Sequence, residues 1–411
     1  MKISFFNKIS LSFFNKVKTW ILSDASVLPL LILMYVSPLP PFSTIKFLKD
    51  RVRGFGWLPN PLKDKGYGYF SKSFKELLST IVLSHRTGSK SVLVEEAERK
   101  LRELEGELDI LDYNLSQIYQ FISIFTSIVP SIVVSTLIFV NFEMSVFIAL
   151  GLALFSVFGG LLGYMVYPSE LSLSCSYRSL VFYVLVIPFY FVFRLFTNTP
   201  LLLSVLVSSI PVSLVEYMFL RKNLVEMRST LDRLRRTVSA PLNIFKILKI
   251  KPSKLLETGG NILVKIINAS IYLIALHSEN KTAYISLERL YTKYYETFRK
   301  IRQKTRVMFF YSVLEAGISV AIYIFIIVTL LFLSQYEVST PVFVIPSQSQ
   351  LNRFISVLDI IFGLNALALS ILTATVREGN ALYFSLYLPL ILTTMIVSYY
   401  VFFTYAPMLF R

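Results

Sequence analysis

Residues 92–142 read VLVEEAERKLRELEGELDILDYNLSQIYQFISIFTSIVPSIVVSTLIFVNF, a charged half that runs directly into an apolar half. Along this stretch apolar residues recur at steps of three and four: Leu101, Leu104, Leu108, Leu111, Leu115, Ile118 and Ile122. Such spacing places one apolar stripe along a helix, and partner helices must cover that stripe. The stretch therefore predicts one continuous helix that belongs to a helical bundle at its start and crosses a membrane at its end.

Residues 283–333 repeat this arrangement. The apolar stripe here consists of Tyr284, Leu287, Tyr291, Tyr294, Phe298, Ile301, Thr305 and Met308. The two stripes superpose at one constant offset, which brings Leu101 onto Tyr291 and Ile118 onto Met308. A recurring unit of this kind indicates a structural repeat, and two unrelated helical hairpins of similar layout are the alternative.

Each long helix follows a shorter predicted helix and a polar turn. The shorter helices are expected at Phe70–His85 and Leu255–His277, and the first hairpin turn contains Gly88, whereas the second has no glycine. A hairpin with one apolar stripe cannot bury that stripe alone. We therefore expect two antiparallel helical-bundle domains, at residues 42–117 and 221–306.

The composition is that of a polytopic membrane protein. Of the 411 residues 55% are hydrophobic, and the mean hydropathy is +0.63. A helix needs about 20 apolar residues to cross a bilayer. Seven stretches have that length: Ile118–Phe142, Met144–Tyr167, Tyr177–Phe196, Pro200–Leu220, Val307–Leu333, Phe354–Val376 and Tyr383–Tyr405. The sequence predicts an all-α integral membrane protein, with four spans in residues 118–220 and three in residues 307–411.

Residues 1–41 are predicted to lie at the membrane surface. Phe and Lys alternate near the N-terminus, as in amphipathic interfacial helices, and no small-residue cleavage site follows an apolar run. Val27–Val36 is apolar but short and contains Pro29, which favours a re-entrant or surface-lying segment. A span that ends near Pro38 is the alternative.

The distribution of positive charge predicts the orientation. Seventeen Lys and Arg residues precede the first predicted span, and nineteen lie in residues 221–306, out of 41 in the chain. Because cytoplasmic loops are enriched in Lys and Arg, both soluble domains and the N-terminus are expected on the cytoplasmic side of the cell membrane.

The sequence predicts neither a catalytic site nor a cofactor. Cys175 is the only cysteine and there are two histidines, so no disulfide, zinc or iron–sulfur ligand set is expected. The glycines near Gly54 and Gly66 are not followed by Gly-Lys-Ser/Thr and are interpreted as hinges. His85 and His277 each end a predicted helix, where the helix dipole favours a cation. We therefore expect a protein that is not an enzyme.

Charged residues near the predicted spans are the second class of candidates, because such groups often mark ion paths. Glu216 and Arg221 lie at the cytoplasmic end of the fourth span, Arg194 lies near the outer end of the third, and Glu315 lies about two turns into the fifth. A proton relay needs several such groups at mid-membrane. Glu315 is therefore interpreted as a carboxylate that is hydrogen-bonded to a neighbouring helix.

The strongest candidate for partner binding is basic. Residues 221–306 contain 19 basic and 6 acidic residues, whereas residues 1–117 contain 17 and 12. Eight of these basic residues form the candidate binding surface: Arg228, Arg233, Arg235, Arg236, Lys246, Lys249, Lys251 and Lys254. Anionic lipids explain those nearest the membrane, and an acidic or nucleotide-bearing protein is the hypothesis for the others. Nucleic acid is not expected, because the chain has no recognisable binding module for it.

At this point the chain resembles the platform proteins of type II secretion and type IV pilus machines, most closely the archaeal pilus and archaellum type. The resemblance covers residues 42–411 and depends on architecture more than on sharp motifs. The matching features are the turn His85-Arg86-Thr87-Gly88-Ser89, the acidic helix Val94–Asp112, the entry into the membrane at Tyr119–Pro130, and a second copy at Leu255–Ser319.

The resemblance implies a role that is not enzymatic. Platforms of this family lie in the cytoplasmic membrane beneath a growing filament, bind a hexameric secretion ATPase, and couple it to the extraction of prepilin subunits; they usually form homo-oligomers. A secondary transporter of a small solute is the main alternative, and a membrane-embedded lipid or glycan enzyme is a further one. Transporters place their repeats in the membrane, whereas the repeat here is predicted outside it.

Overall fold

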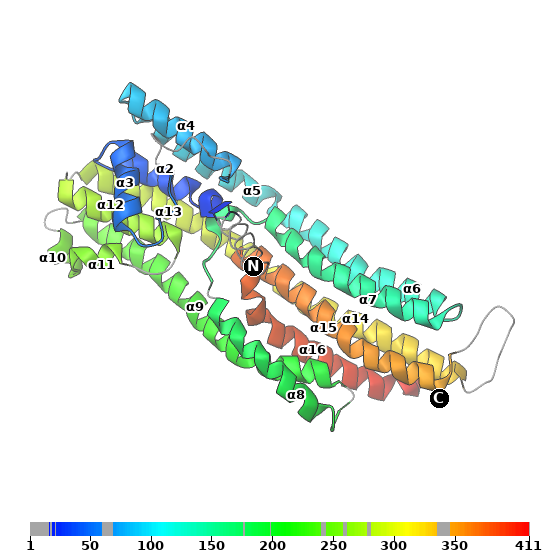
Figure 1. Cartoon of the computed structure of the whole chain (residues 1–411). Coiled ribbons are helices and arrows are strands. Elements are labelled where there is room, and N and C mark those ends of the chain that lie inside the picture. Colours follow the sequence, from blue (N-terminus) through cyan, green and yellow to red (C-terminus); the bar gives the residue numbers. More distant parts are fainter. Residues whose placement is uncertain are drawn as a thin grey trace, which may run out of the picture. The chain divides into compact units, whose positions relative to one another are not determined.

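The computed structural model describes residues 16, 19–20, 22–59, 69–175, 177–197, 199–239, 244–257, 261–277, 281–334 and 346–410. Within these ranges every regular element is a helix (Figure 1). The chain divides into two compact units. Unit 1 comprises residues 1–109, 168–174 and 221–301, and unit 2 comprises residues 110–167, 175–220 and 302–411.

Unit 1 is built around a short apolar helix, α2 (Val27–Val36). Nine of its ten residues are buried, and they pack with α4 (Lys72–Thr87) and α12 (Ile262–His277) in one apolar core. α3 (Pro41–Arg51) follows α2 after a bend of 120°. Leu22–Val36 and Pro41–Arg51 together are long and apolar enough for a broken span or a re-entrant loop, so the predicted re-entrant or surface-lying segment and the alternative of a span stay predictions. The apolar partners of α2 come from segments that lie far away in the sequence.

Unit 1 contains two hairpins whose first helices have the same bounds, and whose second helices begin at the same position, when the chain is aligned as the stripes require. α4 and α12 each contain 16 residues, at 72–87 and 262–277, and the helices that follow them begin at Ser91 and Lys281. These are α5 (Ser91–Ser123) and α13 (Lys281–Lys304). Equivalent positions of the two stripes are buried in both copies, as Leu101 and Tyr291 illustrate. The predicted repeat therefore corresponds to a repeat of helical elements.

Gly88 ends the first of these hairpin helices, as predicted. It caps α4 with φ +68°, a left-handed conformation that glycine adopts without steric cost. The second predicted turn falls at residues 278–280, which lie outside the described part of the chain.

The other elements of unit 1 are short, apart from the end of a long helix. α9 (Pro200–Ser239) enters the unit at Arg221, and it is followed by α10 (Ile244–Leu248) and α11 (Pro252–Leu256). A 3₁₀ turn, Ser169–Leu171, belongs to the same unit.

Unit 2 contains the long apolar segments of the chain. Its elements are the end of α5, η1 (Ile124–Ile128), α6 (Val129–Leu137), α7 (Phe142–Gly159), η2 (Gly160–Met165), η4 (Tyr177–Leu185), α8 (Val186–Phe193), the first part of α9, α14 (Arg306–Leu333), α15 (Gln348–Glu378), η6 (Ala381–Tyr383), α16 (Phe384–Tyr405) and η7 (Ala406–Phe410). In the described ranges six helices are long and apolar enough to cross a membrane. They correspond to six of the seven predicted spans, and they fit a membrane protein.

The predicted third span, Tyr177–Phe196, has a different form. It consists of nine residues of 3₁₀ helix followed by eight residues of α-helix, η4 and α8. Pro188 lies in the first turn of α8, directly after the change from 3₁₀ to α-helix. A 3₁₀ helix rises about 2 Å per residue and an α-helix about 1.5 Å, so the segment covers about 30 Å. That length equals the hydrocarbon thickness of a bilayer, although the segment has few residues.

The chain passes between the two units inside three helices. The divisions at 109/110, 220/221 and 301/302 fall within α5, α9 and α13. The prediction that a helix continues from a charged segment into an apolar one is therefore confirmed for the run Ser91–Leu137, which α5 opens. It also holds for the run Lys281–Leu333, whose 53 residues comprise α13 and α14.

Candidate functional site

The predicted basic surface lies on three helices of unit 1. Four of its arginines are on α9, and four of its lysines are on α10 and α11 or directly beside them. Arg233 is half-buried and the other seven residues are exposed. The structure therefore brings all eight predicted residues into one unit and leaves most of their charge accessible to a partner.

Two of the eight residues are engaged within unit 1. Arg235 Nε lies 3.6 Å from Glu288 Oε1 of α13, and Arg233 Nη1 donates to Asn268 Oδ1 of α12 at 3.5 Å. The hydroxyl of Tyr291 on α13 also donates to the carbonyl oxygen of Met227, at 2.8 Å. These contacts fix the C-terminal part of α9 against the second hairpin. Among the described residues the other six form no ion pair.

The lysines are held by short, tightly turned segments. Lys249, directly after α10, has φ +51° and is the one described non-glycine residue in the left-handed region. The Ile250 N–H donates to the Phe245 carbonyl at 3.3 Å and closes the turn. A left-handed non-glycine residue costs about 1 kcal/mol, and the nearby side chains of Leu248 and Leu255 are buried.

Lys265 on α12 is a further, half-buried cation of unit 1. Its Nζ lies against Gly54, where an added Cβ would be 3.4 Å away. Burial lowers the pKa of Lys265, and the nearby charge of Arg53 lowers it further. Glu226 opposes this repulsion. Sequence reasoning missed Lys265 and Arg53, since neither belongs to a basic run in α9–α11.

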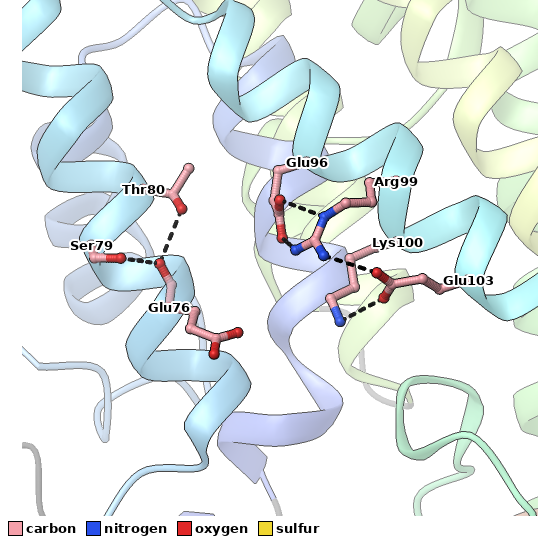
Figure 2. Close-up of polar contacts among 7 residues, drawn as sticks. All are labelled: Glu76, Ser79, Thr80, Glu96, Arg99, Lys100 and Glu103. Atoms are coloured by element: carbon pink, nitrogen blue, oxygen red, sulfur yellow. Dashed lines mark hydrogen bonds and ion pairs between the residues drawn. The ribbon is translucent and has the colours of Figure 1, made fainter.

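In the first hairpin, by contrast, basic and acidic side chains of α5 neutralise one another. Glu96, Arg99, Lys100 and Glu103 on α5 pair with one another along the helix surface (Figure 2). Arg99 bonds to Glu96 and lies 3.0 Å from Glu103, while Lys100 lies 2.8 Å from Glu103. Side chains three and four residues apart on a helix are neighbours, so these charges neutralise one another.

Two further ion pairs join α5 to α13 within unit 1. Arg289 lies 3.0 Å from Glu98, and Lys293 lies 3.1 Å from Glu105. All four side chains are partly exposed, so each pair stabilises the fold by less than about 1 kcal/mol. Their consequence is electrostatic: two basic residues of α13, Arg289 and Lys293, are matched by acids of α5.

The second candidate region is in unit 2, around Glu315 of α14. Its side chain is 1% exposed and accepts hydrogen bonds from hydroxyl groups on a neighbouring helical run. Thr126 and Ser127 contact Oε1, the former at 2.8 Å. Ser123 and Tyr119 contact Oε2, at 2.9 and 3.3 Å. Glu315 is thus hydrogen-bonded to a neighbouring helix, as the sequence led us to expect.

A π-helical turn, η1, presents the hydroxyls of Thr126 and Ser127, whereas Tyr119 and Ser123 lie at the end of α5. The turn precedes Pro130, which has no N–H to donate to the carbonyl of Thr126. The side-chain amide of Asn365 on α15 supplies a donor to that carbonyl at 3.4 Å. Such π-turns often occur at functional sites. The spacing of Tyr119, Ser123, Thr126 and Ser127 on one helical face is a signal that sequence reasoning left unused.

The other candidate residues that the sequence singled out lie elsewhere in the two units. Glu216 is buried and Arg221 is exposed on α9. Arg194 lies at an open cavity of about 800 Å³ that Asp359 also lines. The ring of His85 packs on Phe42 at 4.0 Å between centroids. In the described ranges no group of His, Cys, Asp and Glu side chains is arranged to hold a metal ion.

Glu378 on α15 is a buried acid that the sequence did not point to. It is 0% exposed. Its Oε1 accepts from Tyr387 at 2.7 Å and from Arg302 at 3.3 Å. A buried carboxylate with a cationic partner is a common structural ion pair, and we assign this one no further role.

Glu170 gives unit 1 a predicted dependence on pH. Burial raises the pKa of its carboxyl, and the negative charges of Asp24 and Glu107 add to the effect. The folded chain therefore binds a proton here more readily than the unfolded chain, and stability falls as pH rises above the ordinary range of a glutamic acid. Glu170→Gln should leave the thermal midpoint unchanged near pH 4 and raise it near pH 7.5. Thermal unfolding of the full chain in detergent at the two pH values measures this.

The control for that prediction is Glu95→Gln, at an exposed position on α5. It should shift the midpoint equally little at both pH values. An equal effect of Glu170→Gln at the two pH values would contradict the prediction.

No protein-family model matches the chain, and no curated protein or solved structure gives a significant match.

Proposed function

We propose that this chain is a membrane platform for the assembly of a type IV pilus-like filament, and that it binds a cytoplasmic secretion ATPase through the basic surface of unit 1. The observation that carries the proposal is the pair of equivalent hairpins in unit 1. In each of them the second helix belongs to a run that continues into an apolar segment of unit 2.

Continuous helices support a mechanical role. A helix transmits displacement along its axis, whereas a flexible linker of the same length does not. The chain leaves unit 1 within α5 and within α13, and it enters unit 1 within α9. A motion that an ATPase imposes on unit 1 is therefore proposed to reach the apolar helices through these runs.

The path of the chain also supports a location of all parts of unit 1 on the same side of the membrane. Residues 168–174 and 221–301 belong to the same unit, although residues 175–220 lie between them in unit 2. A chain that leaves one side of a membrane and returns to it crosses an even number of times. The combined length of η4 and α8 suffices for the second crossing that accompanies α9. Together with the Lys and Arg content, this favours a cytoplasmic location for unit 1.

The experiment compares how much ATPase co-purifies with the unaltered chain and with a variant in which the charge of the basic surface is reversed. Arg236→Glu, Lys246→Glu and Lys251→Glu change three exposed residues that have no ion pair in the described part of the chain. We expect co-purification of the ATPase with the tagged chain to fall at least tenfold, because complementary charge is replaced by like charge. Co-purification of the unaltered chain should also weaken with added salt.

The control reverses the same number of charges elsewhere in unit 1. Lys46→Glu, Lys72→Glu and Lys75→Glu lie at exposed positions on α3 and α4. This variant should retain the ATPase. Equal retention by both variants would overturn the assignment of the basic surface, and failure to find any ATPase with the unaltered chain would overturn the platform proposal.

A secondary transporter remains the second candidate, and Glu315 is the observation that favours it, because buried carboxyl groups in membrane helices often belong to ion paths. A gradient-driven uptake assay in proteoliposomes separates the two proposals. A platform gives no uptake of solute that depends on a pH or sodium gradient.

A further inference from the structure

We propose that the open cavity of about 800 Å³ beside Arg194 is a binding site for a phosphate group, and that Arg194 is the residue that recognises it. The residues that line this cavity belong to unit 2. The inference does not depend on the platform function. It follows from the position of the cavity along the apolar helices and from the chemical groups in its wall.

The cavity lies at one end of the apolar helices. Arg194 directly follows α8, Pro200 begins α9, and Asn352 lies in the second turn of α15. The part of α9 that belongs to unit 2, residues 200–220, is about 30 Å long, which is the hydrocarbon thickness of a bilayer. The end that begins at Pro200 therefore falls at the depth of the lipid headgroups, where phospholipids carry their phosphate.

Arg194 provides the positive charge that an anion needs. Its side chain is exposed, and it forms no ion pair with any described residue. Arg353 on α15 is also exposed, but it lies 3.1 Å from Glu143 and is paired. A guanidinium group binds phosphate through two parallel hydrogen bonds. Of these two arginines, Arg194 is the one whose charge is available to a ligand.

The carboxylate in the cavity wall, Asp359, is already engaged. It is 3% exposed. Its Oδ2 accepts from the Leu201 N–H at 2.7 Å, and its Oδ1 accepts from the Leu202 N–H at 3.1 Å. The positive end of the α9 dipole offsets its negative charge. Asp359 thus joins α15 to the start of α9, and it leaves Arg194 unpaired.

The rest of the wall suits an amphipathic ligand. The Tyr190 hydroxyl and the Asn352 amide are further donors, and neither side chain has a hydrogen bond to the described residues. Apolar side chains complete the lining: Leu201, Ile355, Ile360 and Phe403. The volume falls within the range of ligand sites, about 300–1,000 Å³. The wall therefore places donors for a phosphate beside apolar surface for the carbons attached to it.

The test is photolabelling of the full chain in an uncharged detergent, with a phosphatidylglycerol that carries a diazirine beside its headgroup. Mass spectrometry locates the adducts. We expect them on α8, at the start of α9 or on residues 352–360, and at least tenfold fewer in Arg194→Gln, because a charge-assisted hydrogen bond is lost. Arg194→Lys keeps the charge and should give an intermediate yield.

Arg353→Gln is the matched control. It removes an exposed arginine of α15 that does not line the cavity. This variant should keep the adducts at the cavity, and equal thermal midpoints should show that both variants fold. An equal loss of adducts in Arg194→Gln and Arg353→Gln, or full labelling of Arg194→Gln, would overturn the proposal.

Competition on the unaltered chain tests the site without any variant. Unlabelled phosphatidylglycerol should suppress the adducts at the cavity. Suppression by inorganic phosphate as well would identify a free phosphate as the ligand, and failure of inorganic phosphate would identify a lipid headgroup; both results support a phosphate site. Equal suppression by dioleoylglycerol, which has no phosphate, or absence of adducts at the cavity would overturn the proposal.

Discussion

Replacement of Gly160 by alanine is expected to destabilise unit 2 by about 3 kcal/mol, because the added methyl group has no room. Gly160 begins η2, and a Cβ built there would lie 2.6 Å from the carbonyl oxygen of Ala368 and 3.2 Å from the side chain of Ile371. Both neighbours belong to α15, and a backbone oxygen cannot rotate away. Small residues commonly permit such close approach between membrane helices.

The thermal midpoint of the full chain in detergent measures this effect. Gly151→Ala on α7 is the matched control, because no atom lies within 4 Å of its added Cβ. That variant should be neutral or more stable by about 0.5–1 kcal/mol, as alanine is a better helix former than glycine. Equal midpoints for the two variants would show that the contact between η2 and α15 is not close in the protein.

Replacement of Leu108 by proline is expected to abolish filament assembly under the proposed function. Leu108 is 6% exposed and lies in α5, one residue before the division between the units. Proline within a helix removes a backbone hydrogen bond and clashes with the preceding turn, at a cost of about 3 kcal/mol or more. The helical run would then be interrupted where the chain passes from unit 1 to unit 2.

The readouts are filaments on cells, seen by electron microscopy, and retention of the ATPase on the tagged chain. Leu108→Ala is the control, because it removes the buried side chain but keeps the helix. We expect Leu108→Pro to retain the ATPase and lose the filaments, and Leu108→Ala to retain both in part. Normal filaments with Leu108→Pro would rule out transmission through α5.

The periodic parts of the fold could be predicted from the sequence because they depend on local spacing. The stripes that contain Leu101 and Tyr291 are buried in unit 1, and six of the predicted spans coincide with long apolar helices. Hydrophobic period alone determines such elements. Gly88 could be predicted as well, since a glycine after a helix commonly adopts the left-handed conformation.

Features that depend on contacts between distant segments could not be predicted. The burial of Val27–Val36 requires side chains of α12, which lies in the second half of the chain. The cluster at Glu315 brings together α5, η1 and α14, and its hydroxyls are ordinary residues until their common acceptor is known. The amino-acid composition of Tyr177–Leu185 does not indicate that this segment forms a 3₁₀ helix.

The basic surface was predicted by residue type but not by accessibility. Arg233 and Arg235 belong to the same charged run as Arg236, yet contacts with Asn268 and Glu288 engage the first two. Only neighbours in the folded unit distinguish the residues in this run. The choice of Arg236, Lys246 and Lys251 for charge reversal follows from that distinction.

The paired hairpins of unit 1 have first helices of equal length but differ in charge. A partner that recognises shape alone would find two equivalent places to bind, one on each copy. A partner that recognises charge would find one, because the first copy neutralises its own charges along α5 and the positive excess lies beside the second. The repeat thus combines two similar helical hairpins with an uneven distribution of charge. An acidic partner would therefore bind in one orientation only.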